Sequence, residues 1–181
     1  MLGAVASLTL TASAHAACDD AVSQPFKPWL DYAKYSLVTG GDFEAGSPAW
    51  ALTGASVVAG NESYNVGGAG SRSLSIPRGA TATSPSFCGG FDHPTLRLFA
   101  KGGGLLGLLS VTVSYNDSKG ILHSQSLGVV TSSGSWQPSL PLLSLSGLPL
   151  LTGSNLSVSL TAIGGSFTVD DVYVDPYGKR F

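Results

Sequence analysis

Three segments of the chain alternate between apolar and polar residues. They are residues 95–101, 109–115 and 156–162. In the second and third segments, every other residue is apolar and nearly all the residues between are serine or threonine. A period of two residues is typical of a strand that has one buried and one wetter face, as in antiparallel sheets. The pattern therefore predicts three strands that each present one face to a common core.

Shorter apolar runs between glycines and prolines predict further strands. Residues 116–120 and 163–166 are short, glycine-bearing segments that we interpret as hairpin loops. We interpret Gly102–Gly104 as a glycine-rich turn. The leucine-rich stretch 140–151 contains prolines and a glycine, which disfavour a long helix, so it predicts one strand and a loop. The shorter predicted strands are 36–38, 50–52, 55–58, 73–76 and 80–84, and a single helical turn is expected in 29–34.

Many short strands at regular spacing favour a sandwich over an α/β fold, and no segment repeats at a fixed period. The 181 residues suit one domain with a sizeable core. The predicted fold class is therefore an all-β, single-domain, two-sheet antiparallel β-sandwich. We assign Trp50 to its core.

The chain carries little charge. Only 11% of its residues are charged and 43% are hydrophobic, with a net charge of -2, whereas soluble domains average about 25% charged residues. This composition argues against disorder. Because there is no basic patch, the sequence also argues against a nucleic-acid partner.

The N-terminus has the features of an export signal. Residues 2–14 carry no charge, and Ala14-His15-Ala16 is an A-x-A cleavage pattern. The apolar part is too short to cross a bilayer, which takes about 20 residues, and no later segment resembles a transmembrane helix. We expect a signal peptide at 1–16, a lead-in segment at 17–35, a β-sandwich domain at 36–181, and a secreted protein. The alternative is a buried N-terminal helix; the alanine-rich leader is typical of bacteria.

Export changes the interpretation of the two cysteines. Cys18 and Cys88 can form a structural disulfide in an oxidising compartment, with no thiol left over. They are 88 − 18 = 70 positions apart, so closing that loop removes unfolded-chain entropy worth about 4 kcal/mol. A metal or redox pair would favour closer spacing, such as C-x-x-C.

Two motifs near the ends of the predicted domain resemble a known family. Gly40-Gly41-Asp42-Phe43-Glu44-Ala45-Gly46, followed by Trp50, resembles the opening of galactose-binding-like jelly rolls, a superfamily that includes carbohydrate-binding modules. Residues 167–174 resemble their closing strand. The resemblance implies a jelly-roll topology in which the first and last strands run side by side. It also implies a carbohydrate or cell-wall glycan as the ligand.

The same resemblance implies a structural calcium ion. Many members hold calcium between the two end strands, where Glu44 and Asp171 would meet and Asp42 would be a third contributor. Carboxylates supply the oxygen ligands that calcium prefers. Phe167 and Val169 share one strand phase, and the apolar residues after Asp170-Asp171 take the opposite phase. This switch predicts a β-bulge. The alternative is that both aspartates lie at a solvated sheet edge.

Candidate ligand-binding residues are few. One candidate is the polar face of 95–101, namely Arg97, Phe99 and Lys101, beside Ser110, Thr112 and Ser114; another is Trp136 after a Gly/Ser turn. Each also has a structural interpretation, as core or as a covered sheet edge. No nucleophile elbow, H-E-x-x-H or P-loop motif is present, so we expect no enzymatic activity. The predicted function is a secreted glycan-binding module; the alternative is a secreted structural or cell-surface protein with no small-ligand site. No sequence feature specifies an oligomeric state.

Overall fold

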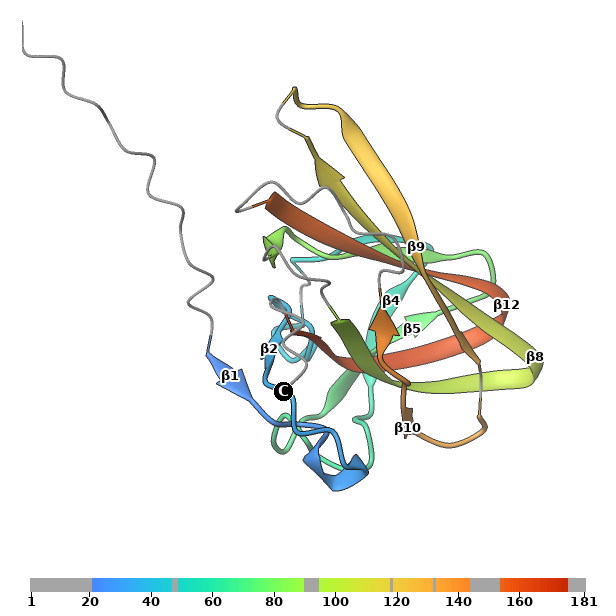
Figure 1. Ribbon diagram of the computed structural model, residues 1–181. Coiled ribbons are helices and arrows are strands. Elements are labelled where there is room, and N and C mark those ends of the chain that lie inside the picture. Colours follow the sequence, from blue (N-terminus) through green and yellow to red (C-terminus); the bar gives the residue numbers. More distant parts are fainter. Residues whose placement is uncertain are drawn as a thin grey trace, which may run out of the picture.

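The computed structural model describes residues 21–46, 49–89, 95–117, 119–131, 133–143 and 154–175 (Figure 1). The predicted signal peptide and Cys18 lie outside the described residues, and Cys88 is described by its backbone alone. The prediction of a Cys18–Cys88 disulfide therefore falls outside the described residues. No helix in the described part of the chain is long and apolar enough to span a membrane.

The described residues are almost entirely β-structure. A short 3₁₀ helix, η1 (Lys27–Trp29), lies slightly earlier than the helical turn predicted in 29–34, because Pro28 starts it and Leu30 ends it in the left-handed conformation. The strands belong to one antiparallel 12-stranded sheet. They are β1 Val22–Ser23, β2 Tyr35–Leu37, β3 Ala51–Thr53, β4 Ser56–Ala59, β5 Arg72–Ile76, β6 Thr81–Thr83, β7 Phe87–Gly89, β8 Thr95–Asn116, β9 Leu122–Thr131, β10 Gln137–Pro138, β11 Leu142–Leu143 and β12 Ser154–Asp175.

Two long, curved strands fold this sheet into two layers (Figure 1). Strands β8 and β12 pair with each other along almost their whole length. The first layer combines residues 95–103 of β8 and 166–175 of β12 with β2, β5, β10 and β11. The second layer combines their other halves, residues 108–116 and 154–164, with β6, β7 and β9. The predicted two-sheet antiparallel sandwich is confirmed, and its two sheets are joined through β8 and β12.

Two predicted turns are wrong. Residues 102–104 and 163–166 lie inside β8 and β12, and the strands continue through them with register shifts near Gly164. Glycine is used here to bend a strand and not to reverse the chain. The hairpin predicted at 116–120 is confirmed, because the Asp117 amide donates to the Ile121 carbonyl at 2.9 Å and joins β8 to β9.

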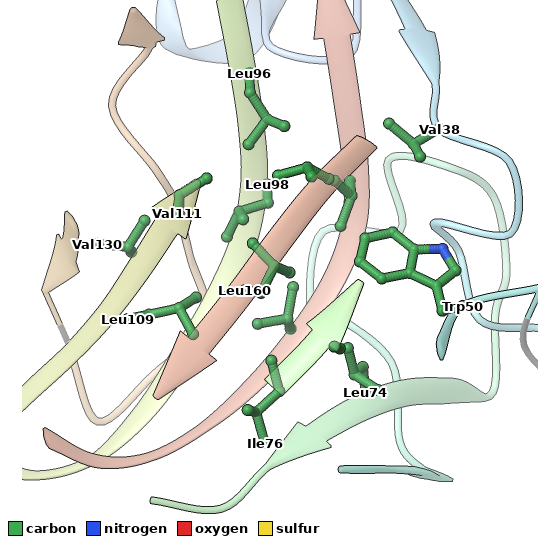
Figure 2. Packing of buried hydrophobic residues seen from close by; sticks show 14 of the residues in the cluster. Val38, Trp50, Leu74, Ile76, Leu96, Leu98, Leu109, Val111, Val130 and Leu160 are labelled. Atoms are coloured by element: carbon green, nitrogen blue, oxygen red, sulfur yellow. The ribbon is translucent and has the colours of Figure 1, made fainter. Parts of the chain in front are cut away.

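The main core lies between the two layers (Figure 2). The apolar positions of all three alternating segments are buried in it, as predicted. Leu98, Val111 and Leu160 each have 0% exposed surface, and each buried side chain of this kind contributes about 1.5–3 kcal/mol. Trp50 is also buried, and its indole Nε1–H donates to the Thr39 carbonyl at 3.1 Å.

The bulge predicted at Asp170-Asp171 is confirmed. The pairing of β12 with β8 shifts register between Asp170 and Tyr173, and Asp171 has a φ of 49°. Aspartate is one of the few residues besides glycine that adopts this conformation readily. Because the bulge adds one residue, Val169 before it and Val172 after it face the same core.

The predicted adjacency of the end strands is also confirmed. Strand β2 pairs antiparallel with the last part of β12, where Leu37 lies opposite Tyr173 and Ser36 opposite Val174. This pairing places the segment after β2, which contains Asp42 and Glu44, beside the bulge: the Val172 amide donates to the Gly41 carbonyl at 3.1 Å.

The bend in β12 requires a glycine at position 165. Its φ is +74°, and a Cβ there would overlap the carbonyl oxygen of Gly103. Gly120 has nearly the same φ, +77°, but open space around it. Gly120→Ala should therefore cost only the conformational strain, about 1–3 kcal/mol, whereas Gly165→Ala should cost about 1–3 kcal/mol more through overpacking. Urea denaturation measures the free energy of unfolding of both variants. An equal decrease in the two would contradict the close contact between β8 and β12 at the bend.

Candidate functional site

A group of carboxylates surrounds the bulge in β12. Asp170 and Asp171 are 1% and 4% exposed. The β4–β5 loop, residues 60–71, passes over them and donates backbone hydrogen bonds to both. The Glu62 amide donates to Asp170 Oδ2 at 2.9 Å, and the Gly67 amide donates to Asp171 Oδ2 at 3.1 Å. Buried carboxylates need such partners, and charge-assisted bonds of this kind are among the stronger ones.

Two further carboxylates hold the same loop. Glu62 is itself 1% exposed, and its two oxygens accept the amides of Tyr64, at 2.5 Å, and Val66, at 2.6 Å. Glu44 accepts the amides of Ser71, at 2.8 Å, and Arg72, at 2.7 Å, and also the Ser71 hydroxyl. We call Glu44, Glu62, Asp170 and Asp171 the carboxylate frame. Together they anchor the β4–β5 loop along its length.

The carboxylates of the frame lie close enough together to change one another's pKa values. Burial raises the pKa of Asp170 to about 8, and the charges of Asp171 and Glu62 add to the rise. Burial likewise raises the pKa of Asp171 to about 6, with further contributions from Glu62, Asp42 and Glu44. The structure therefore brings the three predicted calcium ligands, Asp42, Glu44 and Asp171, within electrostatic reach of one another.

The side chains around the bulge suit a hard cation. Its side chains offer only oxygen ligands, as calcium requires. Most of those oxygens already accept amide hydrogens, and Asp42 Oδ1 accepts the Glu44 amide at 3.4 Å. Within the described residues, no three His, Cys, Asp or Glu side chains are already arranged to hold a metal ion. The sequence indicated Asp170 as part of the bulge but not as a member of the site, and it missed Glu62.

The outer face of the first layer is covered by the lead-in segment. Phe26 and Tyr35 from this segment form a second buried cluster with Phe99 and Tyr173. The Phe26 ring centroid lies 5.5 Å from that of Phe99 in a stacked arrangement, and 5.1 Å and 5.7 Å from those of Tyr35 and Tyr173. The lead-in segment thus belongs to the folded domain.

Arg97 is the polar anchor of this cover. Its Nη1 forms a salt bridge of 2.7 Å with Asp31 Oδ2, and its Nε and Nη2 donate to the Ser139 carbonyl. Its guanidinium carbon lies 4.1 Å from the centroid of the Phe26 ring. Arg97 and Phe99 are only 4% and 0% exposed. The prediction that they contact a ligand does not fit this arrangement, because the lead-in segment occupies their face.

At the edge of the lead-in segment, three aromatic side chains from separate segments pack against the second buried cluster. Trp29 comes from the lead-in segment, Tyr64 from the β4–β5 loop, and Trp136 from the residue before β10. We call these three residues the aromatic platform. Tyr64 is 41% exposed, and the two tryptophans are half-buried. The Lys101 ammonium lies over the ring of Trp136, with its Nζ 5.3 Å from the ring centroid.

Tyr64 connects the platform. Its ring centroid lies 4.9 Å from that of Trp29, edge to face, and 5.7 Å from that of Phe99 beneath. Its hydroxyl donates to the Trp136 carbonyl at 3.1 Å. Of these residues, the sequence had indicated Trp136 and Lys101; it missed Trp29 and Tyr64, which belong to no periodic pattern.

The serine and threonine residues predicted beside Arg97 lie elsewhere. Ser110, Thr112 and Ser114 belong to the half of β8 in the second layer. Hydroxyls on that layer's outer face bond to one another across strands, as in Ser114–Ser124 at 2.8 Å and Thr81–Thr161 at 2.9 Å. The bend in β8 therefore separates the two halves of the predicted polar face.

Comparison with known proteins identifies the fold. No family model matches the chain, and no curated protein matches it in sequence. Among solved structures, the CBM22-1 xylan-binding domain from Paenibacillus barcinonensis Xyn10C matches with a TM-score of 0.55 at 17% identity, covering 74% of this chain and 90% of that one. The C-terminal family 22 carbohydrate-binding module of Clostridium thermocellum Xyn10B matches at 0.50 and 15% identity, covering 78% and 93%.

Larger proteins contain the same fold. The CBM22-1–GH10 modules of Clostridium thermocellum endo-1,4-β-D-xylanase 10B, complexed with xylohexaose, match with a TM-score of 0.56 at 19% identity over 76% of this chain. The chain spans only 28% of that protein. Neighbours matched over most of their own length are isolated carbohydrate-binding modules. The chain thus has the same β-sandwich fold as these modules, as the resemblance of its two end motifs implies.

The raised pKa values of the frame predict a pH dependence for the protein without bound metal. The folded chain keeps a proton that the unfolded chain releases on Asp170 between about pH 4 and 8, and on Asp171 between about pH 4 and 6. Because the folded state binds more protons than the unfolded state, the free energy of unfolding should fall as the pH rises through this range. Melting temperatures in EDTA should decrease from pH 4.5 to 8, and Asp170→Asn should flatten that decrease. A stability that rises over the same interval would contradict the buried-carboxylate account.

Proposed function

We propose that this chain is a secreted, non-catalytic glycan-binding module whose ligand stacks on the aromatic platform. The observation that carries the proposal is that Trp29, Tyr64 and Trp136, from three separate segments, all pack against the second buried cluster while remaining partly exposed. The fold adds support, because it is the fold of carbohydrate-binding modules. Export would also place Cys18 and Cys88 in an oxidising compartment, where we propose that they pair.

The chemistry of the platform suits a sugar. Aromatic rings present an electron-rich face, and the C–H groups on one face of a pyranose ring can lie against it. Ligand sites of this type combine apolar and aromatic surface with a few polar groups that set the orientation. Here the Lys101 ammonium and the Tyr64 hydroxyl are the polar groups beside the rings.

The platform can be tested with a glycan array followed by titration. A neighbour of the same fold was solved with xylohexaose, so xylohexaose is the first soluble probe. Trp136→Ala and Tyr64→Ala should each weaken binding at least about tenfold, as expected for aromatic anchors. Tyr32→Ala is the matched control, because Tyr32 is 51% exposed on the lead-in segment and is not a member of the aromatic platform. No binding by the wild type to any glycan on the array, or an equal loss in the Tyr32 variant, would refute the proposal.

We also propose that a structural calcium ion binds beside the bulge in β12, with Asp42, Glu44 and Asp171 as its side-chain ligands. The support is electrostatic: the negative charges of Glu62, Asp42 and Glu44 all raise the pKa of Asp171. A divalent cation would offset this repulsion. When bound, it would link the segment after β2 to the last strand.

Calcium binding predicts a change in melting temperature. A ligand that binds only the folded state adds about 2.7 kcal/mol of stability at a hundredfold excess over its dissociation constant. Calcium should therefore raise the melting temperature relative to EDTA, and Asp171→Asn should abolish the rise. Asparagine tolerates the positive φ of residue 171, so the backbone should be preserved.

The control is Asp117→Asn, which removes an exposed hairpin carboxylate far along the chain from the frame. This variant should keep the full response to calcium. A wild-type protein whose melting temperature is the same in calcium and in EDTA would rule out the structural ion.

A further inference from the structure

Glu62 holds the part of the β4–β5 loop that carries Tyr64. Its own amide donates to Asp170 Oδ2 at 2.9 Å, which ties it to β12. Its carboxylate then accepts the amides of Tyr64 and Val66, two and four residues further on. Glu62, which is 1% exposed, thus bonds to the last strand through its backbone amide and to the Tyr64 backbone through its carboxylate, whereas Tyr64 itself is 41% exposed.

The location of the Tyr64 ring depends on this local geometry. The ring touches Trp29 from the lead-in segment and Phe99 from β8, and its hydroxyl reaches the Trp136 carbonyl. All three contacts require the Tyr64 backbone to stay where Glu62 holds it. Without that restraint, the loop would keep its anchors at Gly67 and at Ser71–Arg72 but would lose the one nearest to Tyr64.

We propose that Glu62 is a positioning residue for the glycan site: it acts through Tyr64 and completes the aromatic platform. This inference rests on the proposed function for its consequence in binding, although the positioning itself can be measured without a ligand. The hydrogen bond that links Glu62 to the platform is the one that it accepts from the Tyr64 backbone amide.

The chemistry explains why a carboxylate is needed. An ionised carboxylate only accepts hydrogen bonds, and each of its two oxygens takes one loop amide. A glutamine has the same shape but turns one of the two acceptors into a donor. In Glu62→Gln, either the Tyr64 or the Val66 amide would face that donor, and a buried donor without an acceptor is destabilising.

The chain contains a matched control in its β8–β9 hairpin. The Asp117 carboxylate accepts the amides of Lys119 and Ile121, at 2.8 Å and 2.9 Å, which are also two and four residues further on. Asp117→Asn therefore removes the same charge from a loop in the second layer, away from the platform, while its Oδ1 can still accept both loop amides, so it controls for the loss of charge alone.

The first arm of the test is structural and uses the protein without ligand. In the wild type, nuclear Overhauser contacts should connect the ring protons of Tyr64 and Trp29. Glu62→Gln should lose these contacts, and Asp117→Asn should keep them. If Glu62→Gln does not fold, Glu62→Asp replaces it, because it keeps the charge but is too short to reach both amides; the contacts should then weaken. A folded Glu62 variant with unchanged Tyr64–Trp29 contacts would overturn the proposal.

The second arm measures binding with xylohexaose and a double-mutant cycle. Glu62→Gln should weaken binding about tenfold in the wild-type background and have no further effect in Tyr64→Ala. An equal loss in both backgrounds would show that Glu62 does not act through Tyr64. If the wild type binds no glycan, the proposed function fails, and the structural arm alone still decides whether Glu62 positions Tyr64.

Discussion

The bulge at Asp170-Asp171 is the constraint on which both faces of β12 depend. One extra residue, with a φ of 49° at Asp171, lets Phe167 and Val169 share a core with Val172 and Val174. It also turns Tyr173 outward against Phe26 in the second cluster. The two carboxylates that it buries would be strongly destabilising alone, and the amides of the β4–β5 loop offset that penalty.

A chain of contacts leads from this bulge to the surface. The carboxylate frame holds the β4–β5 loop, which carries Tyr64. Independently, Arg97 holds the lead-in segment through Asp31, and that segment carries Trp29. The aromatic platform therefore consists of side chains from irregular segments that a rigid two-layer core supports. Binding residues are often found in this arrangement, since loops vary more freely than the strands beneath them.

The sequence predicted those features that depend on residues close together in the chain. Alternation located the core strands, and the change of phase after Val169 located the bulge. The glycines at 102–104 and 165 were misinterpreted because glycine marks a turn and a bend within a strand equally well. Arg97 and Phe99 were predicted to be accessible to a ligand because the residues that cover them, Phe26 and Asp31, lie some seventy residues earlier in the chain. Tyr64 could not be recognised, because its importance depends on the contacts of its loop with β12.

Amide hydrogen exchange of the wild-type protein, resolved to single residues, tests the central claim most directly. If the carboxylate frame orders the β4–β5 loop, the amides of Glu62, Tyr64, Val66, Gly67 and Ser71 should exchange slowly, although much of this loop is exposed and contains no regular secondary structure. Their protection should approach that of the neighbouring strands β4 and β5. Exchange of these amides at the rate of an unstructured chain would contradict the account.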